Sequence, residues 1–368
     1  MSWTAERIAR LRLARTHGIG PLTLHTLLTT YETATNALEN LPDRARRAGR
    51  DISLCDESRV KREIESTEDF GGNISFPGES DFPVLLGKLD PPPSVISWRG
   101  NIELANRSCV AMVGARNASA AAMRIAGDLA RDLGLAGWVI SSGLARGIDT
   151  ACHKGSLDTG TIAVIAGGLD NIYPPQNAGL FEHIAETGLI LTESPFGYDP
   201  RARDFPRRNR LITGLAYGVV VVEAAMKSGS LISARTALEQ GREVMAVPGS
   251  PLDPRSKGSN GLIRNGATLV ETAEHILDVL APMEQSQSDL FRESEQSFHG
   301  DEAPAIDIEL TSDAADTLLS LVSPVPVSLG DLARMADLPA RDCASLLVEL
   351  ELAGKIRTLP GGMIKKAL

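Results

Sequence analysis

The chain has few aromatic residues and few cysteines. Phenylalanine, tryptophan and tyrosine make up 4% of its 368 residues, and its four cysteines (Cys55, Cys109, Cys152 and Cys343) lie far apart without a CxxC pair. Zinc sites and disulfide frameworks use cysteines at short or regular spacings. The pattern therefore predicts reduced thiols in a cytoplasmic protein, with no disulfide and no metal.

Long apolar runs are also missing. No stretch of about 18 apolar residues is present to span a membrane, and the first residues, MSWTAERIAR, lack the apolar segment of a secretion signal. The signatures of several enzyme classes, Walker A, GxSxG and HExxH, do not occur. We expect a soluble protein that uses no cofactor and does not contact membranes.

The length and the hydrophobic content of the chain suit a protein of several packed domains. A length of 368 residues with 43% hydrophobic content predicts two or three domains. The formal net charge is −10. An acidic total argues weakly against a protein that coats nucleic acid in bulk. It allows a local basic groove, because binding depends on the field at the site.

Residues 1–70 are predicted to form a small helical domain. The apolar pattern of RIARLRLARTHGIG ends in a Gly-Ile-Gly turn, and Pro21 then stands where the first turn of a second helix is expected. This pattern is typical of a helix-hairpin-helix, whose turn amides can contact a phosphate. A helical hairpin that only packs in a small bundle would have the same pattern, so both interpretations stay open.

Residues 71–281 are predicted to form one domain, which from about residue 107 to residue 280 alternates between short apolar runs and helical patterns. The runs are SCVAMVG, GWVISS, GTIAVIAG, LILTES, GVVVVEA and EVMAVPG. Continuous apolar strands that alternate with helices indicate a parallel sheet covered on both faces. We therefore expect an α/β fold, doubly wound and Rossmann-like, with ligands beyond the carboxyl ends of the strands. A proline run within residues 71–106 precludes a helix there and is expected to bridge folded parts.

The composition changes after this region. Residues 282–306 are polar, acidic and without periodicity, which predicts a flexible linker. Residues 307–368 return to three short helical patterns and a hairpin, which predicts a winged helix-turn-helix. Its candidate recognition helix, ARDCASLLVELELAG, carries one arginine and three acidic residues. Helices that read duplex DNA are usually basic, so a protein-binding or dimerising role is favoured over duplex contact.

Glycines, hydroxyls and helix starts follow the predicted strands. Arg116 follows VAMVG, Arg146 lies in GLARGID after VISS, and MKSGS follows VVVVEAA. Because the carboxyl ends of parallel strands share one edge of the sheet, these turns should lie close together. Glycine lets backbone amides approach an anion, and a helix N-terminus favours negative charge. The sequence therefore predicts an anion-binding edge.

The segment FPRRNR, residues 205–210, gathers three arginines after the run LILTES. We expect Arg208 and Arg210 to join the same edge. The alternative is that this segment is a solvated run of arginines or forms salt bridges to Asp199, Asp204 and Glu223. Cationic and glycine-bearing turns recur at several strand ends, which favours the first interpretation and suits a backbone with several phosphates in series.

Catalytic residues are harder to find. Asp149 and His153 share a helix face beside Cys152, but adjacent helix residues point in different directions, so His153 is interpreted as structural or phosphate-facing. Glu223 follows a strand and could be a general base, or equally a buried partner of Arg208 or Arg210. We therefore do not expect an enzyme.

The collected motifs resemble those of the DNA processing protein A family (DprA, also called Smf). They are VGARNAS, SGLARGIDTACHKGSLDTGTIAVIAGGLDNIYPPQN, FPRRNRLITGLAYGVVVVEAAMKSGSLISARTALEQGREVMAVPG and GSNGLIRNGA, in the order of the family across residues 75–280. The helical N-terminus resembles the SAM-like or helix-hairpin-helix segment of many members. The C-terminal winged helix is likewise a common addition.

The resemblance implies an extended Rossmann fold that binds single-stranded DNA without ATP and forms homodimers. It also implies that the protein protects incoming DNA and loads RecA onto it, past single-strand-binding protein, in natural transformation or homologous recombination. By motif, the DNA contacts carry over to Gly114, Arg116, Ser142, Gly143, Arg146, Gly147, Arg207, Arg208, Asn209 and Arg210. Further candidates at the next strand end are Lys227, Ser228, Gly229 and Ser230.

Two positions depart from the family pattern. Ala120, with two more alanines after it, stands where many members have a Tyr-Gly pair, which leaves a base-stacking aromatic unassigned. Phe205 or Tyr173 could take that place. Pro175 and Gln176 occupy a loop in which some relatives carry a basic residue.

Two other functions are weighed against the binding protein. A nucleotide phosphoribohydrolase would share the Rossmann-like fold, but the turn EAAMKSGSLISA lacks the PGGxGT signature of those enzymes. A transcription regulator would act through the winged helix, and the acidic candidate helix argues against it.

Overall fold

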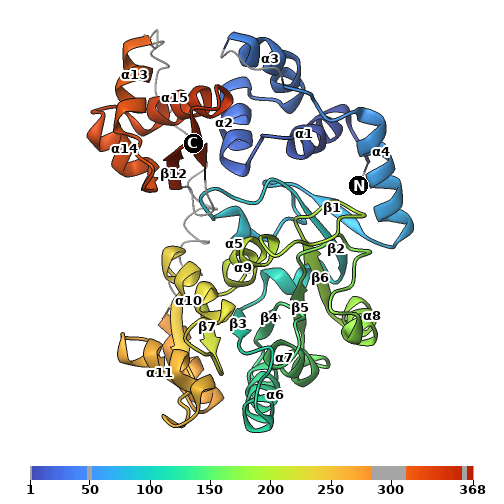
Figure 1. Cartoon of the computed structure of the whole chain (residues 1–368). Coiled ribbons are helices and arrows are strands. Elements are labelled where there is room, and N and C mark those ends of the chain that lie inside the picture. The colour runs from blue at the N-terminus through green and yellow to red at the C-terminus, as the bar shows by residue number, and fades with distance from the viewer. Residues whose placement is uncertain (1, 48–51, 283–311, 359–362, 368) are drawn as a thin grey trace. The chain divides into compact units, whose positions relative to one another are not determined.

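The computed structural model describes residues 2–47, 52–282, 312–358 and 363–367 (Figure 1). The described residues fall into two compact units. The first is drawn from residues 1–65, 90–95 and 301–368; the second, here called the sheet unit, is drawn from residues 66–89 and 96–300. The predicted linker, residues 282–306, lies outside the described residues except for its first residue. Among the described residues, no helix is long and apolar enough to cross a membrane.

One large sheet is the framework of the sheet unit. Its strands are β1 (Asn73–Ser75), β2 (Ile96–Gly100), β3 (Cys109–Val113), β4 (Val139–Ser142), β5 (Thr161–Val164), β6 (Leu189–Thr192), β7 (Gly218–Val221), β8 (Glu243–Ala246) and β9 (Thr268–Leu269). Their order across the sheet is β1-β2-β6-β5-β4-β3-β7-β8-β9. The strands from β6 through β9 in that order are parallel, and β1 and β2 are antiparallel additions at one edge.

Helices cover both faces of this sheet. They are α5 (Val84–Gly87), α6 (Ala120–Leu135), α7 (Ile148–Ser156), α8 (Ala178–Thr187), α9 (Asp204–Gly214), α10 (Gly229–Glu239) and α11 (Lys257–Arg264), with short 3-10 helices η1 (Ile102–Asn106), η2 (Pro175–Asn177) and η3 (Pro254–Ser256). Strand β3 is buried throughout: Ala111 and Val113 join one apolar cluster, Val110 and Met112 another. Side chains alternate along a strand, so the two clusters lie on opposite faces. The predicted doubly wound α/β fold is confirmed.

The strands β1 and β2 come from the segment that was predicted only to bridge folded parts. Strand β2 pairs antiparallel with β6, and β1 pairs with β2 through Asn73 and Trp98. Trp98 also donates its indole N–H to Ser75 Oγ at 2.8 Å. Short strands held by distant partners have little local pattern, which is why the sequence did not reveal them.

The N-terminal part of the first unit is helical, as predicted. Its helices are α1 (Ala5–Arg15), α2 (Pro21–Tyr31), α3 (Ala34–Arg47) and α4 (Glu57–Asp69), the last of which runs into the sheet unit. Leu13, Leu24 and Leu27 form the centre of their apolar cluster. Gly18, in the turn between α1 and α2, has a φ of 86°, a left-handed conformation that favours glycine.

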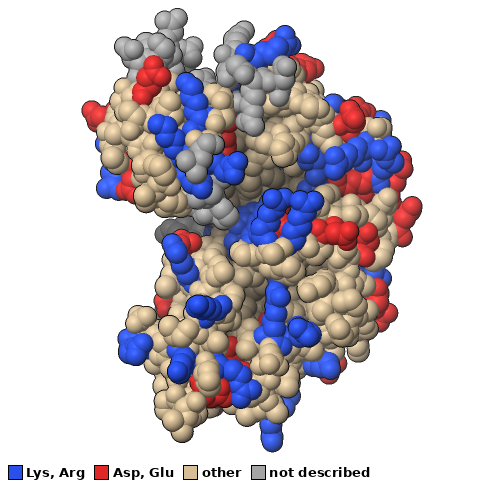
Figure 2. All heavy atoms as spheres, viewed as in Figure 1, with Lys and Arg blue, Asp and Glu red and all other residues tan. Residues whose placement is uncertain are grey.

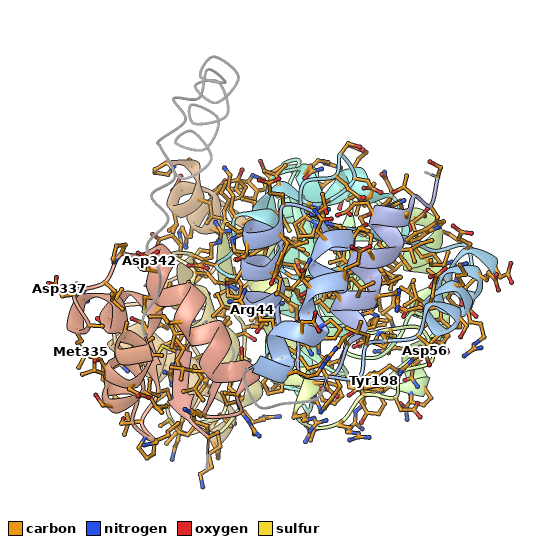
Figure 3. All side chains as sticks on the ribbon, turned by 90° about the horizontal axis from the view of Figure 1, so that it is seen from above. Arg44, Asp56, Tyr198, Met335, Asp337 and Asp342 are labelled. Carbon is orange, nitrogen blue, oxygen red and sulfur yellow. The ribbon has the colours of Figure 1, made fainter. Side chains whose placement is uncertain are left out.

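The C-terminal part is a winged helix, which also confirms the prediction. It has helices α13 (Ser312–Leu321), α14 (Leu329–Met335) and α15 (Ala340–Leu352), and strands β10 (Val327–Ser328), β11 (Ile356–Thr358) and β12 (Met363–Lys366) in the order β10-β12-β11. Leu318, Leu332 and Leu346 pack in its core. Met335 and Asp337 point away from that core (Figure 3).

Candidate nucleic-acid interface

A cavity of about 940 Å³ lies beyond the carboxyl ends of β3 and β7. These strands are neighbours at the centre of the sheet, and from them the chain continues outward in opposite directions. Such a switch point leaves a crevice between the turns that follow the two strands. Its lining includes the end of β3 and the turn after it (residues 113–117), most of residues 225–233 after β7, parts of α9 and η3, and also Ala145, Asp149 and Tyr173. The predicted edge therefore contains a real recess.

Three exposed cations line this cavity: Arg116, Lys227 and Arg255. A second, small cavity of about 20 Å³ shares Arg116 with it and is also lined by exposed Arg146. In the lower part of Figure 2, where Figure 1 draws β3, β7, α10 and α11, basic side chains are spread over the surface, with acidic ones beside some of them. The acidic net charge of the chain therefore does not extend evenly over its surface.

Arg116 lies over one ring of an aromatic pair. Its guanidinium lies 4.9 Å from the centroid of the Phe205 ring, within the range of a cation–π contact. The Phe205 and Tyr173 rings are 5.6 Å apart at 57°. All three side chains line both cavities. The two aromatics considered in the sequence analysis therefore lie together at the cationic edge.

Arg208 lies at the same edge but is almost completely buried, with 6% of its surface exposed. Its Nη1 donates to the carbonyl oxygens of Gly143 at 2.5 Å and Val164 at 2.6 Å. Burial lowers the pKa of its guanidinium to about 10. Arg208 therefore holds the main chain at the ends of β4 and β5, and only the rest of its guanidinium is available to the cavity.

Asp149 is the buried partner of this arginine. Its Oδ2 accepts the N–H groups of Gly143 at 3.2 Å and Ala145 at 3.3 Å. Burial raises the pKa of its carboxyl, while the nearby charge of Arg208 acts in the opposite direction. Asp149 accepts hydrogen bonds from the loop after β4, and Arg208 donates one to the same loop. Together they fix the position of the loop that carries Arg146.

Two glycines make that loop possible. A Cβ on Gly143 would lie 2.0 Å from Arg208 Nη1, so any side chain would displace the guanidinium. Gly147 has a φ of 76°, and a Cβ there would lie 2.3 Å from the carbonyl oxygen of Ala115. These predicted site glycines bring the turns after β3 and β4 together.

His153 is structural, which is one of the two roles considered for it. It is completely buried, and burial lowers the pKa of its imidazole to about 3. Its Nε2 accepts the N–H of Leu144 at 3.2 Å, so Nδ1 carries the proton and donates to Thr161 Oγ1 at 2.7 Å. Among the described residues, no three His, Cys, Asp or Glu side chains are grouped to hold a metal ion.

The other arginines of FPRRNR are paired with Glu193. Arg210 forms an ion pair with it and is 13% exposed, whereas Arg207 has its Nε 3.5 Å from Glu193 Oε2 and is 53% exposed. The alternative prediction, that this segment forms salt bridges, is therefore confirmed. The predicted partners were wrong, because the partner of both arginines is Glu193. Asp199 accepts a hydrogen bond from Asn171. Asp204 accepts the O–H of Tyr198 at 2.8 Å (Tyr198 is labelled in Figure 3).

Within the part of the chain that the structure describes, Glu223 bonds to the start of α6 and not to Arg208 or Arg210. Its carboxylate accepts the N–H of Ser119 at 3.1 Å and its O–H at 2.8 Å. Ser119 Oγ in turn accepts the N–H of Ala122 and caps α6. Glu223 is 4% exposed, so its role is to join the turn after β7 to the start of α6.

The remaining predicted residues lie at the same edge, and all of them except Ser142 line the large cavity. Ser142 is buried and donates its O–H to Met112 O at 2.7 Å, and a Cβ on Gly114 would collide with Ile148 at 2.5 Å. Asn209, Ser228, Gly229 and Ser230 line the cavity. Ser228 caps α10, accepting the N–H of Ser230 at 3.3 Å.

Arg255 was missed by the sequence analysis. It lies in η3 after β8, and Asp253 holds it through Nε at 3.1 Å and Nη2 at 2.7 Å. The signal that could have found it is its position, because β8 is the strand next to β7 and its following turn reaches the same edge.

Three family models match the chain. One described as DNA recombination-mediator protein A matches residues 73–281, a DprA-like N-terminal HHH domain matches residues 4–66, and a DprA winged helix domain matches residues 302–362. The first match alone covers more than half of the chain. The chain belongs to the DprA family. As a family member it has a role in DNA processing and recombination.

Individual DprA proteins agree with this assignment. The chain is 39% identical to Protein Smf of Escherichia coli (strain K12) over 79% of its length and 76% of the relative. It is 40% identical to DprA of Bacillus subtilis (strain 168) over 60% of its length and 76% of the relative.

Two solved DprA structures resemble the fold. DprA from Streptococcus pneumoniae superposes with a TM-score of 0.63 and 31% identity, over 76% of this chain and 98% of that one. DprA from Helicobacter pylori, a structure described for its single-stranded DNA binding mode, gives a TM-score of 0.53 and 30% identity over 57% and 96%.

Proposed function

We propose that this DprA family member binds single-stranded DNA in the cavity beyond β3 and β7 and delivers RecA to the bound strand. The observation that carries the proposal is a recess of about 940 Å³ lined by the exposed cations Arg116, Lys227 and Arg255 in a chain of net charge −10. Cations concentrated at one concave place attract a polyanion despite an acidic total.

The chemistry of the lining suits phosphates in series. Arg146 and Arg116 lie on one side of the crevice, and Lys227 and Arg255 lie on the turns after β7 and β8. The N-terminus of α10, with Ser228 and the exposed Gly229, adds backbone N–H donors that favour an anion. A strand crossing the recess can therefore contact several cations, as grooves for single-stranded nucleic acid do.

A recess also suits an unpaired strand better than a duplex. The bases of a single strand can turn away from the backbone and reach the aromatic and apolar parts of the lining, such as Phe205 and Ile212. In a duplex the bases are stacked and paired, and only the outer backbone reaches such a recess. This difference supports a preference for single strands.

The acidic residues near the cavity support binding over catalysis. Asp149 and Glu223 are both buried and accept hydrogen bonds from loop backbone. Neither is placed as a free general base, which a nucleotide-hydrolysing enzyme would need. We infer a binding protein that uses no cofactor.

RecA delivery, protection of incoming DNA, exchange with single-strand-binding protein and homodimerisation form the finer part of the proposal. Membership of a family of recombination mediators supports it. The test is RecA-dependent ATP hydrolysis on a strand covered by single-strand-binding protein. We expect substoichiometric amounts of this protein to shorten the lag before hydrolysis. An unchanged lag would remove RecA delivery from the proposal and leave DNA binding standing.

Binding itself is tested by fluorescence anisotropy with a labelled single strand over a salt series. The comparison is between the wild type and Arg116→Ala combined with Lys227→Ala. Affinity should fall with salt, and the slope of log K against log salt should flatten by about 0.7 for each phosphate contact removed. Arg235→Ala is the control, because Arg235 is 82% exposed, pairs with Glu239 and does not line either cavity. A wild-type slope near zero, or a double variant that binds like the control, would contradict the proposal.

A further inference from the structure

Leu144, in the loop after β4, has a main-chain conformation that its residue type disfavours. Its φ is 55°, in the left-handed region that suits glycine. Its side chain is completely buried in an apolar cluster that also contains Ala163, Ile165 and Phe181. The side chain therefore anchors the loop in the core. A strained main chain persists only where the surrounding groups hold it in place.

Side chains from two other segments hold the main chain of Leu144. Its N–H donates to Nε2 of His153 on α7 at 3.2 Å. Its carbonyl oxygen accepts from Nδ2 of Asn177, the residue before α8, at 2.8 Å. A carbonyl oxygen can only accept, so the amide nitrogen of Asn177 has to face it. Both polar groups of the strained residue are thus bonded to side chains.

Asn177 also reaches the next residue of this loop. Its Nδ2 donates to Thr150 Oγ1 at 3.0 Å, and Thr150 donates its O–H to the carbonyl oxygen of Ala145 at 2.7 Å. The direct distance from Asn177 Nδ2 to that oxygen is 3.5 Å. Asn177 therefore contacts the carbonyl groups of the two residues that directly precede Arg146.

This use of the Asn177 side chain is unusual for its position. Asn177 is the N-cap residue of α8, where an asparagine side chain ordinarily accepts an N–H of the first helical turn. Its side chain makes no such bond. It is 7% exposed and does not line either cavity, so it does not reach a bound strand itself. Its amide bonds to the loop after β4 in place of its own helix.

We propose that Asn177 is a positioning residue for single-stranded DNA, which fixes the left-handed turn at Leu144 so that Arg146 contacts a phosphate. The inference rests on the proposed function and adds a residue that acts through another. Arg146 is exposed, lines the small cavity and lies two residues after Leu144. A loop that is already in place loses little conformational freedom on binding, so its contact contributes more fully to affinity.

A double-variant cycle tests the link between Asn177 and Arg146. Asn177→Ala, Arg146→Ala and the variant with both substitutions are titrated with one labelled oligothymidylate over a salt series. Asn106→Ala is the matched control. The Asn106 side chain also bonds to the main chain of another element, accepting the N–H of Val84 at 3.0 Å, but it does not line either cavity. Melting temperatures report the stability of each variant.

We expect Arg146→Ala and Asn177→Ala each to weaken binding about tenfold, as the loss of one hydrogen bond to a charged group does. Each should flatten the slope of log K against log salt by about 0.7, the value for one phosphate contact. The double variant should bind within about twofold of Arg146→Ala, because residues that act through one contact are not additive. Asn106→Ala should bind like the wild type.

Thr150→Val takes the place of Asn177→Ala in the cycle if the latter does not fold. Valine keeps the shape of threonine and removes the hydroxyl that connects Asn177 to the carbonyl oxygen of Ala145. We expect about threefold weaker binding, which corresponds to one neutral hydrogen bond, and no further loss when Arg146 is already alanine.

The possible failures differ from one another. If the losses of Asn177→Ala and Arg146→Ala multiply, Asn177 does not act through Arg146, and the inference is wrong. It is also wrong if either single variant binds like the wild type. Failure of the wild type to bind the strand would instead refute the proposed function.

Discussion

Arginines of identical chemistry have different roles at this edge of the sheet. Arg116 is exposed and lies over the Phe205 ring, whereas Arg208 is buried and bonded to two main-chain carbonyl groups. Arg210 is committed to Glu193. Charge alone therefore does not identify a DNA contact. The surroundings of each guanidinium decide whether it binds a phosphate or positions a loop.

Removing Arg208 should destabilise the protein. Arg208→Ala removes the two buried hydrogen bonds from the charged guanidinium to the carbonyl oxygens of Gly143 and Val164, and each such bond contributes about 1.5–3 kcal/mol. It also removes the nearby positive charge that lowers the pKa of the buried Asp149 carboxyl. Urea unfolding followed by tryptophan fluorescence measures this, because Trp98 and Trp138 lie in the sheet unit. The exposed Arg207→Ala is the control and should change stability by no more than about 0.5 kcal/mol. An Arg208→Ala variant of normal stability that has lost DNA affinity would show a direct phosphate contact instead.

The cationic edge itself could be predicted from the sequence, because turns after parallel strands must converge. Which arginine of FPRRNR is buried was partly predictable. Arg207 and Arg210 are three residues apart on α9 and so share a helix face, which is where they meet Glu193. The burial of Arg208 was not predictable, since it depends on hydrogen bonds to Gly143 and Val164, which lie at the ends of two other strands.

At the scale of elements, turns after strands make the site. The turn after β3 supplies Arg116, the turn after β4 supplies Arg146, and the turn after β7 supplies Lys227. Each is short and meets a helix start. Glycines matter only where backbones or side chains come close, as at Gly143, and not at Gly229, which has open space around it.

This contrast gives a paired prediction. Gly143→Ala puts a methyl group into the Arg208 guanidinium, so we expect a loss of stability of about 1–3 kcal/mol from overpacking. Gly229→Ala meets no atom within 4 Å at the first position of α10 and should leave stability unchanged or slightly higher. Thermal unfolding of both variants tests this. Equal melting temperatures would mean that the turn after β4 tolerates displacement of Arg208.

Element by element, the sequence was most informative where strands are buried and least informative at the edge of the sheet. The runs that became β3 to β8 were recognisable because both faces of a parallel sheet are covered. β1 and β2 were missed because they join the sheet only through the pairing of β2 with β6, which lies far along the chain. Arg255 was missed for a related reason, since nothing in DPRS marks a turn that reaches a crevice between other strands.

At the scale of the whole molecule, an acidic chain combines a cationic recess with three kinds of domain. Family models match the helical N-terminal part, the sheet unit and the winged helix separately. Helix-hairpin-helix and winged-helix domains can both contact nucleic acid. The central claim is therefore one of location: the single strand lies at the ends of β3 and β7.

Location is tested most directly by photo-crosslinking. A single strand carrying 5-iododeoxyuridine at defined positions is irradiated with the full-length protein, and crosslinked peptides are identified by mass spectrometry. We expect crosslinks to Tyr173, Phe205 and residues 225–233, which line the cavity. Crosslinks confined to residues 4–66 or to residues 312–367 would contradict the account and place the strand on a flanking domain.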